Sequence, residues 1–221
     1  MPKAVYYTKE KLTQAVIDLI RKDGPESLTS RKIGKELGCS VSPIFREYKN
    51  MEEIHTDVRK AAEKIFTDFL ADSVNYEPAF KEFGIRLLRF SKEEPNLFHY
   101  LFLEKGCSSD IAHKIAQECL KQTSASFNLT PEQSEQIFDQ EWTFACGLAM
   151  LCNRNPEEYP DERISRMLST QFMSLLILIK SEHKVVNIKP KEKLYGNDVL
   201  PELRNAAHSR NPGHQCRWKQ E

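Results

Sequence analysis

Apolar residues recur three or four positions apart along most of this chain, which is the spacing of amphipathic helices. Leu12, Val16, Leu19 and Ile20 form the first such stripe, and it ends at a Gly-Pro pair that stops a helix. Further stripes predict helices over 51–70, from Pro78 to about Phe90, over 95–102 and 110–127, from Pro131 to about Arg154, and from about 161 to 184. No segment alternates as a strand does, so the chain is predicted to be all-α, with about nine helices.

The stretch from Leu28 to Ile54 packs several helix starts into a short length. Thr29 is a good N-cap, because its hydroxyl accepts a hydrogen bond from an unpaired amide of the first turn, and Ile33 and Leu37 then fall on one face. Gly38 suits the end of this helix, and Ser40 is expected to cap a second one. Two short helices joined by such a turn predict a helix-turn-helix.

The second helix of this motif is the candidate DNA reader. Its predicted core stripe is Val41, Ile44, Phe45 and Tyr48, which leaves Ser42, Pro43, Arg46 and Glu47 mostly on the outside. Asn50, with Glu53 three positions later, resembles a capping box and predicts the start of the next helix. A helix placed in this way reaches the major groove of DNA with its outer side chains.

This pattern resembles the tetracycline-repressor (TetR) family of bacterial transcriptional regulators over roughly residues 8–58. The resemblance lies in the Thr-initiated helix, the segment 33–38, the turn, and Phe45 where a Tyr is commonest. Two residues depart from the family pattern: Met51 stands where a phosphate-contacting Lys is frequent, and Pro43 lies in the reading helix. Lys49 is an alternative source of the phosphate contact, and Pro is tolerated in a first helical turn.

The resemblance implies a cytoplasmic, homodimeric repressor that binds double-stranded DNA at a palindromic operator and is released by a small effector. The DNA-binding residues that we predict are Thr29, Ser30, Arg31, Ser40, Ser42, Pro43, Phe45, Arg46 and Lys49. The alternative is an all-helical adaptor, or protein-interaction module, in which the same helical hairpin does not bind DNA and its basic residues only face water.

The distribution of charge fits a protein that places one end on DNA. The net charge is zero over 221 residues, yet residues 1–60 carry 12 Lys and Arg against 9 Asp and Glu, and residues 61–188 carry 13 against 19. A basic N-terminal part on an acidic body favours contact with phosphate at that end. We therefore predict a DNA-binding domain over 1–50, an effector-binding and dimerisation domain over 51–188, and an irregular basic tail over 189–221.

The last two predicted helices have the composition of a helix-pairing surface. Ala145, Gly147 and Ala149 place small residues beside large ones, and Met167, Leu168, Phe172, Leu175, Leu176 and Ile179 form a wide apolar stripe. Packing within one chain would account for part of this surface. The family resemblance implies that both helices pair with those of a second subunit in a four-helix bundle, which predicts a homodimer.

The middle helices are expected to enclose a mainly apolar effector. The candidate pocket residues are Phe83, Leu87, Phe90, Phe98, Phe102, Phe127, Trp142, Cys146 and Met150. The polar candidates are His99, His113, Gln117, Glu141 and Asn153, although the sequence favours a position on the surface or at a helix cap for each of them.

Catalysis, cofactor binding and metal binding find little support in the sequence. There is no GxSxG, P-loop, HExxH or paired-glycine dinucleotide motif, and the six cysteines show neither a CxxC pair nor metal-ligand spacing. Reduced thiols are expected; the alternative is a redox or metal sensor that uses Cys146 and Cys152, but six residues apart on a helix these two face different directions. No signal peptide or membrane helix is apparent, so we expect a cytoplasmic protein that is not an enzyme, has no cofactor and does not contact a membrane.

Overall fold

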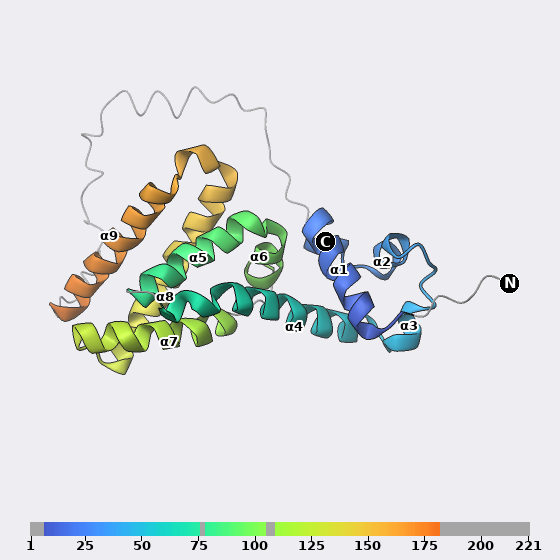
Figure 1. Ribbon diagram of the computed structural model, residues 1–221, viewed down its shortest axis with the longest axis horizontal. Helices are drawn as coiled ribbons and strands as arrows, with labels where there is room; N and C mark the ends of the chain where they lie inside the picture. Colours follow the sequence, from blue (N-terminus) through green and yellow to red (C-terminus); the bar gives the residue numbers. More distant parts are fainter. Residues whose placement is uncertain (1–6, 76–77, 105–108, 182–221) are drawn as a thin grey trace, which may run out of the picture. The chain divides into compact units, whose positions relative to one another are not determined.

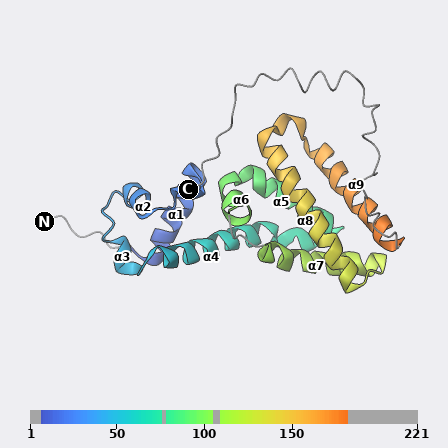
Figure 2. The same cartoon turned by 180° about the vertical axis from the view of Figure 1, so that it is seen from behind.

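A computed structural model describes residues 7–75, 78–104 and 109–181. All of the regular structure in these ranges is helical, as predicted, and they contain nine α-helices and no strand (Figures 1 and 2). The α-helices are α1 Lys9–Asp23, α2 Ser30–Glu36, α3 Ile44–Glu47, α4 Met51–Leu70, α5 Ala79–Glu93, α6 Pro95–Phe102, α7 Asp110–Phe127, α8 Pro131–Arg154 and α9 Asp161–Lys180. The predicted basic tail over 189–221 lies outside the described residues.

Most helices begin at the residue that the sequence predicts. The Thr29 hydroxyl accepts a hydrogen bond from the Lys32 amide at the start of α2. Thr130 and Gln133 form a complete capping box at the start of α8. Asn50 accepts from the Glu53 amide at 2.9 Å, while the Glu53 carboxylate accepts from the Lys49 amide at 3.0 Å. Local side-chain hydrogen bonds therefore set these boundaries, because they satisfy amides that the helix itself leaves unpaired.

Helix α3, the predicted DNA reader, does not start where the sequence predicts. Ser40 does not cap it: α3 has only four residues, its N-cap position is Pro43, and no side-chain cap is present. The chain instead turns at Val41, whose carbonyl accepts from the Ile44 and Phe45 amides at 3.2 and 3.3 Å. Pro43 lacks an amide hydrogen and stands where a helix leaves that group unpaired, so it fits the start of α3.

Half of the predicted core stripe of α3 is also wrong. Ile44 and Tyr48 are buried, but Val41 is 39% exposed and Phe45 is 41% exposed. The reason is the short helix: Val41 precedes α3, and regular helical spacing holds only from Ile44 onward. The Tyr48 hydroxyl completes the core by a 3.0 Å hydrogen bond with Thr13 in α1.

Helices α4 and α5 organise the rest of the described chain. Helix α4 packs against α1 at its start and against α5, α6 and α7 further along, so it links the N-terminal helices to the body (Figure 1). Helix α5 is surrounded by α4, α6, α7, α8 and α9. Phe66 of α4 packs edge-on against Phe90 of α5 and Phe102 of α6, with ring centroids 5.1 and 4.9 Å apart. A Cβ at Gly84 would lie 3.3 Å from Leu168, which shows how closely α9 approaches α5.

Candidate DNA interface and ligand cavity

The residues predicted to bind DNA all lie in or beside the α2–α3 motif and reach the surface. Thr29, Ser30 and Arg31 stand at the start of α2, and Lys49 comes directly before α4. Thr29, Arg31, Ser40, Ser42, Phe45, Arg46 and Lys49 are exposed, and Ser30 and Pro43 are half-buried. The predicted residues all fall within 29–49 of the sequence, and the structure places none of them in the core.

The turn between α2 and α3 is held by backbone contacts at two glycines. Gly38 has a φ of 62°, which favours glycine, and the Cys39 amide donates to the Gly34 carbonyl at 2.9 Å. A Cβ at Gly34 would lie 3.0 Å from the Cys39 carbonyl oxygen, so a larger residue would push the turn away from α2. In the sequence, Gly34 is only one residue of the segment that resembles the family. Its close packing against Cys39 depends on the fold of the turn.

Two tyrosines, Tyr7 and Tyr48, stabilise the α2–α3 motif. The Tyr7 hydroxyl donates to the Leu37 carbonyl at 2.8 Å, which satisfies a carbonyl at the end of α2. Tyr48 is 1% exposed, and the Lys9 ammonium lies 4.7 Å from its ring centroid. Burial is the main reason that the pKa of Tyr48 is raised. The tyrosine stays neutral at physiological pH and acts as part of the core.

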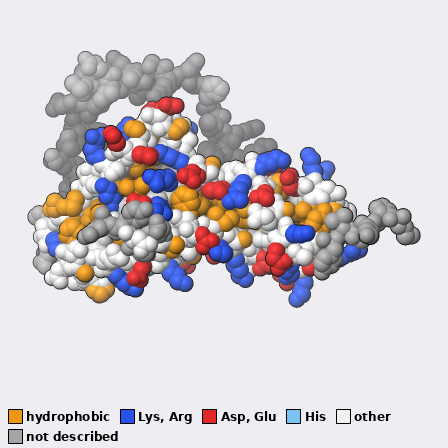
Figure 3. Space-filling model, in the orientation of Figure 1, with side chains coloured by type: hydrophobic (Ala, Val, Ile, Leu, Met, Phe, Trp, Pro, Cys, Tyr) orange, Lys and Arg blue, Asp and Glu red, His pale blue; other side chains and the backbone are white. Residues whose placement is uncertain are grey.

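Basic side chains surround the motif on the outside. Arg31, Lys32, Lys35, Arg46 and Lys49 are all exposed, and Figure 3 shows Lys and Arg side chains on the outer surface of the N-terminal helices, with acidic ones among them. Lys49 is paired loosely with Glu53, at 4.0 Å, and its side chain is 88% exposed. Such a surface offers mobile cations to a phosphate backbone at little cost in desolvation.

A cavity of about 700 Å³ lies among helices α5, α7, α8 and α9. Most of its wall is apolar, and aromatic rings come from all four helices. The lining residues are Asn75, Pro78, Ala79, Phe80, Lys81, Phe83, Gly84, Leu87, Gln122, Thr123, Ser126, Phe127, Phe138, Glu141, Trp142, Ala145, Leu168, Ser169, Phe172 and Met173. Its size and composition match sites that take a drug-sized organic molecule.

Four of the nine pocket candidates line this cavity: Phe83, Leu87, Phe127 and Trp142. The other five do not. Phe90 and Phe98 are fully buried in the core, Phe102 packs against Phe66 and Trp142, Cys146 is half-buried outside the lining, and Met150 is 56% exposed on α8.

Several lining residues were not among the predicted pocket residues. Three of them are aromatic: Phe80, Phe138 and Phe172. Leu168 and Phe172 of α9 were predicted only as part of the helix-pairing stripe. Phe80 and Phe172 lie 6.0 Å apart between ring centroids, and Phe127 and Phe172 lie 5.9 Å apart. The spacing of Phe80, three residues before Phe83, was the available signal, because both fall on one face of α5.

Glu141 is the one predicted polar candidate that reaches the cavity. The sequence favoured a position on the surface or at a cap for it, which is wrong, since the residue is 7% exposed. Its Oε1 is buried and has no hydrogen-bond partner in the structure, and burial raises the pKa of this carboxyl group to about 7. An ordinary folding role would have supplied a partner for a group so costly to bury.

The other polar candidates have partners elsewhere. His113 and Gln117 of α7 bond to Glu135 of α8, at 2.8 and 2.5 Å. His99 faces Glu104, and Asn153 donates to the Ser91 carbonyl. None of these four lines the cavity.

The described thiols have the properties of packing residues. Cys39, Cys119, Cys146 and Cys152 are free, and burial raises the pKa of Cys119 to about 11 and that of Cys146 to about 12. Thiols so rarely ionised react slowly. No group of His, Cys, Asp and Glu among the described residues is arranged to hold a metal ion, and Cys107 and Cys216 lie outside those residues.

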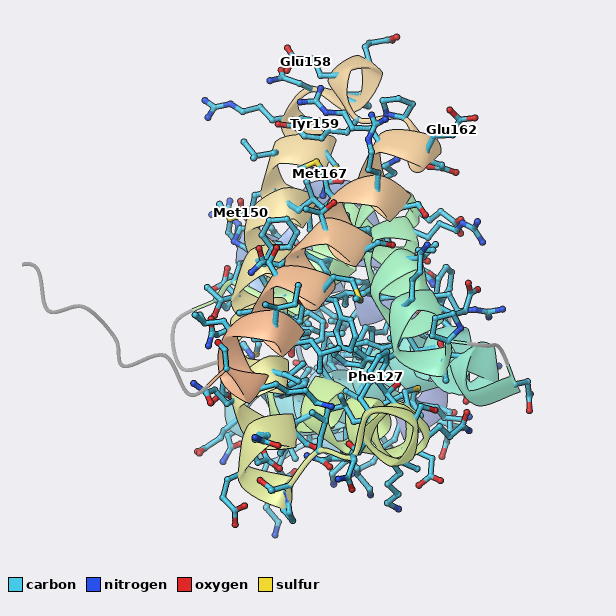
Figure 4. All side chains as sticks on the ribbon, turned by 90° about the vertical axis from the view of Figure 1, so that its left-hand side faces the viewer. Phe127, Met150, Glu158, Tyr159, Glu162 and Met167 are labelled. Carbon is cyan, nitrogen blue, oxygen red and sulfur yellow. The ribbon has the colours of Figure 1, made fainter. Side chains whose placement is uncertain are left out.

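Helices α8 and α9 pack side by side (Figure 4), and both carry exposed apolar residues. Met150 and Leu151 of α8 are 56% and 46% exposed, and Ile177 and Leu178 of α9 are 65% and 49% exposed. Gly147 of α8 is exposed too, and a Cβ there would meet no atom within 4 Å. Apolar side chains gathered in this way mark surfaces that other proteins cover. None of the described helices could cross a membrane by length and hydropathy.

The fold is shared with two solved structures. A candidate transcriptional regulator from Pseudomonas aeruginosa PAO1 superposes with a TM-score of 0.61 at 15% identity, covering 79% of this chain and 93% of that one. A transcriptional regulator from Rhodococcus sp. RHA1 superposes with a TM-score of 0.57 at 16% identity, covering 77% and 97%. No protein-family model and no curated protein matches the sequence.

Proposed function

We propose that this protein is a DNA-binding transcriptional regulator of the TetR type, a repressor that a small, mainly apolar effector releases from a palindromic operator. The observation that carries the proposal is the pairing, in one chain, of an exposed helix-turn-helix with an aromatic-lined, mainly apolar cavity. The proposed division is a DNA-binding domain over 1–50 and an effector-binding and dimerisation domain over 51–188. Such a regulator acts in the bacterial cytoplasm and is not an enzyme.

The geometry of α2 and α3 supports the DNA-binding part. The outer residues of α3 and its turn are Ser42, Phe45 and Arg46, and their side chains are exposed. Arginine is suited to bidentate contact with guanine or with phosphate, and an exposed aromatic ring packs well against sugar or thymine methyl groups. The two superposed structures support the regulator role through their shared fold.

The exposed face of α8 and α9 supports a homodimer. Gly147, Met150 and Leu151 lie three and four positions apart on α8, which places them on one side of the helix. A two-fold axis through this face would cover the same residues of both subunits and would hold the two DNA-binding domains at a constant separation. Two domains fixed in this way read an inverted repeat.

Helix α4 supplies the route from cavity to DNA. It contacts α1 beside the motif and also α5 and α7, which form part of the cavity wall. A ligand that fits the cavity better in one orientation of α4 shifts the population of the two orientations. The effect on DNA affinity is limited to that difference in ligand binding, typically about 1 to 3 kcal/mol.

DNA binding at two salt concentrations tests the proposal against the adaptor alternative. A repressor binds random duplex DNA weakly, and its affinity falls steeply as salt displaces the phosphate contacts. An adaptor shows no binding at either concentration, and that result would reject the proposal. Footprinting on the upstream region of the protein's own gene then tests for a palindrome.

Loss of operator binding on addition of a ligand tests the effector part. Trp142 lines the cavity and packs edge-on against Phe102 at 5.1 Å, so its fluorescence is a direct report of ligand entry. Ligands that stabilise the protein and change Trp142 fluorescence while leaving DNA affinity unchanged would show a cavity without a switch.

A further inference from the structure

Glu141 places a single buried carboxylate in the cavity wall. Its neighbours one turn away on α8, Phe138 and Ala145, line the cavity with it, as does Trp142. The residue is only 7% exposed, and its carboxyl oxygen Oε1 has no hydrogen-bond partner. A carboxylate held in such surroundings leaves an interaction unmade unless another molecule supplies it.

The remaining wall favours a cationic partner for this group. Phe80, Phe83, Phe127 and Phe172 surround the space with aromatic rings, whose faces attract organic cations. Among the described residues, the lining contains no acid besides Glu141 and no His or Cys, and no cluster there fits a metal ion. An inorganic cation would lack the ligands that it needs in this cavity, whereas an ammonium group on an apolar body would find both a carboxylate and rings.

Lys81 is the opposing charge in the lining and comes from the first turn of α5. It is half-buried, while Glu141 is buried, so its ammonium remains partly in water. The lining residues from α7 are Gln122, Thr123, Ser126 and Phe127, and those from α9 are Leu168, Ser169, Phe172 and Met173, none of which carries a charge. Of the two charged residues in the described lining, Glu141 is therefore the more buried.

We propose that the cavity recognises a hydrophobic organic cation, with Glu141 accepting a hydrogen bond from its ammonium group and the aromatic wall enclosing its body. The inference rests on the proposed function for the biological use of the site, because it names the chemical class of the effector. The binding itself needs no DNA, so it is tested separately.

The test uses three probes with one apolar body and three charges: 4-phenylbutylamine, 4-phenyl-1-butanol and 4-phenylbutyrate. Binding to the full chain is measured by calorimetry at pH 8, where the amine is protonated, as lysine is. We expect the amine to bind tightest. Glu141→Gln should weaken the amine by about tenfold or more and change the alcohol by less than about threefold, because the substitution keeps the shape and removes the charge.

Asp139→Asn is the matched control, since it removes one charge from an exposed position of α8 outside the cavity. It should leave all three affinities unchanged. Equal binding of the three probes, tightest binding of the carboxylate, or an equal loss for all probes in Glu141→Gln would each overturn the proposal.

A second readout uses the wild-type chain and so does not depend on the folding of a variant. Protonation of the Glu141 carboxyl removes its charge, so affinity for the amine should fall from pH 8 to pH 6 while affinity for the alcohol stays constant. A flat profile for the amine would contradict the proposal. If the wild-type chain showed no salt-dependent DNA binding, the proposed regulator function would be rejected, but the proposal that the cavity binds an organic cation would not be affected.

Discussion

Arg21 of α1 donates to the Glu94 carboxylate from Nε at 3.0 Å and from Nη2 at 2.7 Å, which joins α1 to the segment between α5 and α6. The Asn96 amide donates to the Arg21 carbonyl at 2.8 Å beside this pair. The side chains are 35% and 23% exposed, so water screens them only in part. The pair therefore joins α1, which packs against α2 of the helix-turn-helix, to the helices of the body.

This pair should contribute to stability through its bidentate geometry. Replacing Arg21 by Gln, Glu94 by Gln, and both together forms a double-mutant cycle, and we expect a coupling of about 1 kcal/mol in urea unfolding. The same cycle at Lys64 and Asp68, an exposed pair on α4, is the control and should give less. A coupling no larger at Arg21–Glu94 than at that control would mean that this ion pair contributes no more to stability than an exposed pair does.

Replacing Arg46 by Ala should weaken operator binding by about 1 to 3 kcal/mol, because the exposed guanidinium of α3 is the best-placed group for a base or phosphate contact. Lys121→Ala removes a cation from α7, far along the chain from the motif, and should change affinity little. Fluorescence anisotropy with labelled operator DNA measures both. Unchanged affinity in Arg46→Ala, with a normal melting curve, would mean that α3 is not the reader.

Phe45 and Ile44 are adjacent in α3, yet their substitution should have opposite consequences. Ile44→Ala creates a cavity beneath the motif and should cost about 2 to 5 kcal/mol of unfolding free energy. Phe45→Ala should cost much less, since 41% of the side chain is already exposed, and should mainly reduce DNA affinity. Urea unfolding measures the first effect and anisotropy the second. A large loss of stability in Phe45→Ala would restore it to the core.

Ile177→Glu should convert the proposed homodimer to a monomer, since it places a charge at an exposed apolar position of α9. Sedimentation velocity measures the change. Leu103→Glu is the control, because Leu103 is also an exposed apolar residue, at 38%, but follows α6. A wild-type chain that sediments as a monomer, or a dimer that survives Ile177→Glu, would place the dimer interface elsewhere or remove it.

Glu141 should make the protein less stable as pH rises. Its carboxyl group ionises at about 7 in the folded chain and near 4.5 when exposed, so the unfolded state releases its proton first. The contribution of Glu141 to the free energy of unfolding is therefore largest below about pH 4.5. It falls by on the order of 3 kcal/mol as pH rises to about 7.

Urea unfolding of the wild type and of Glu141→Gln from pH 5 to pH 8 measures this effect as the difference between the two proteins. The variant should gain relative to the wild type up to about pH 7 and then stay level. A difference that is constant with pH would show that Glu141 is ionised in the folded protein throughout this range.

Local chemistry in the sequence determined where the helices begin. Thr29, Asn50 and Thr130 were predicted as caps and act as caps, because each hydroxyl or amide oxygen binds an amide only a few residues away. The helical periodicity likewise predicted the all-α class and the helices of the described residues, since apolar side chains that recur about every 3.6 residues give a helix one apolar face to pack.

Tertiary packing decided the exposure of individual side chains and the wall of the cavity. Val41 and Phe45 fit the helical stripe by spacing but are 39% and 41% exposed, whereas Phe90 and Phe98 fit a pocket by type but are buried in the core. Glu141 shows the converse, since a charged residue in the middle of a long helix is normally exposed. Spacing along one helix states which residues share a face, whereas burial depends on which other helices meet that face, and this is a property of contacts distant in the sequence.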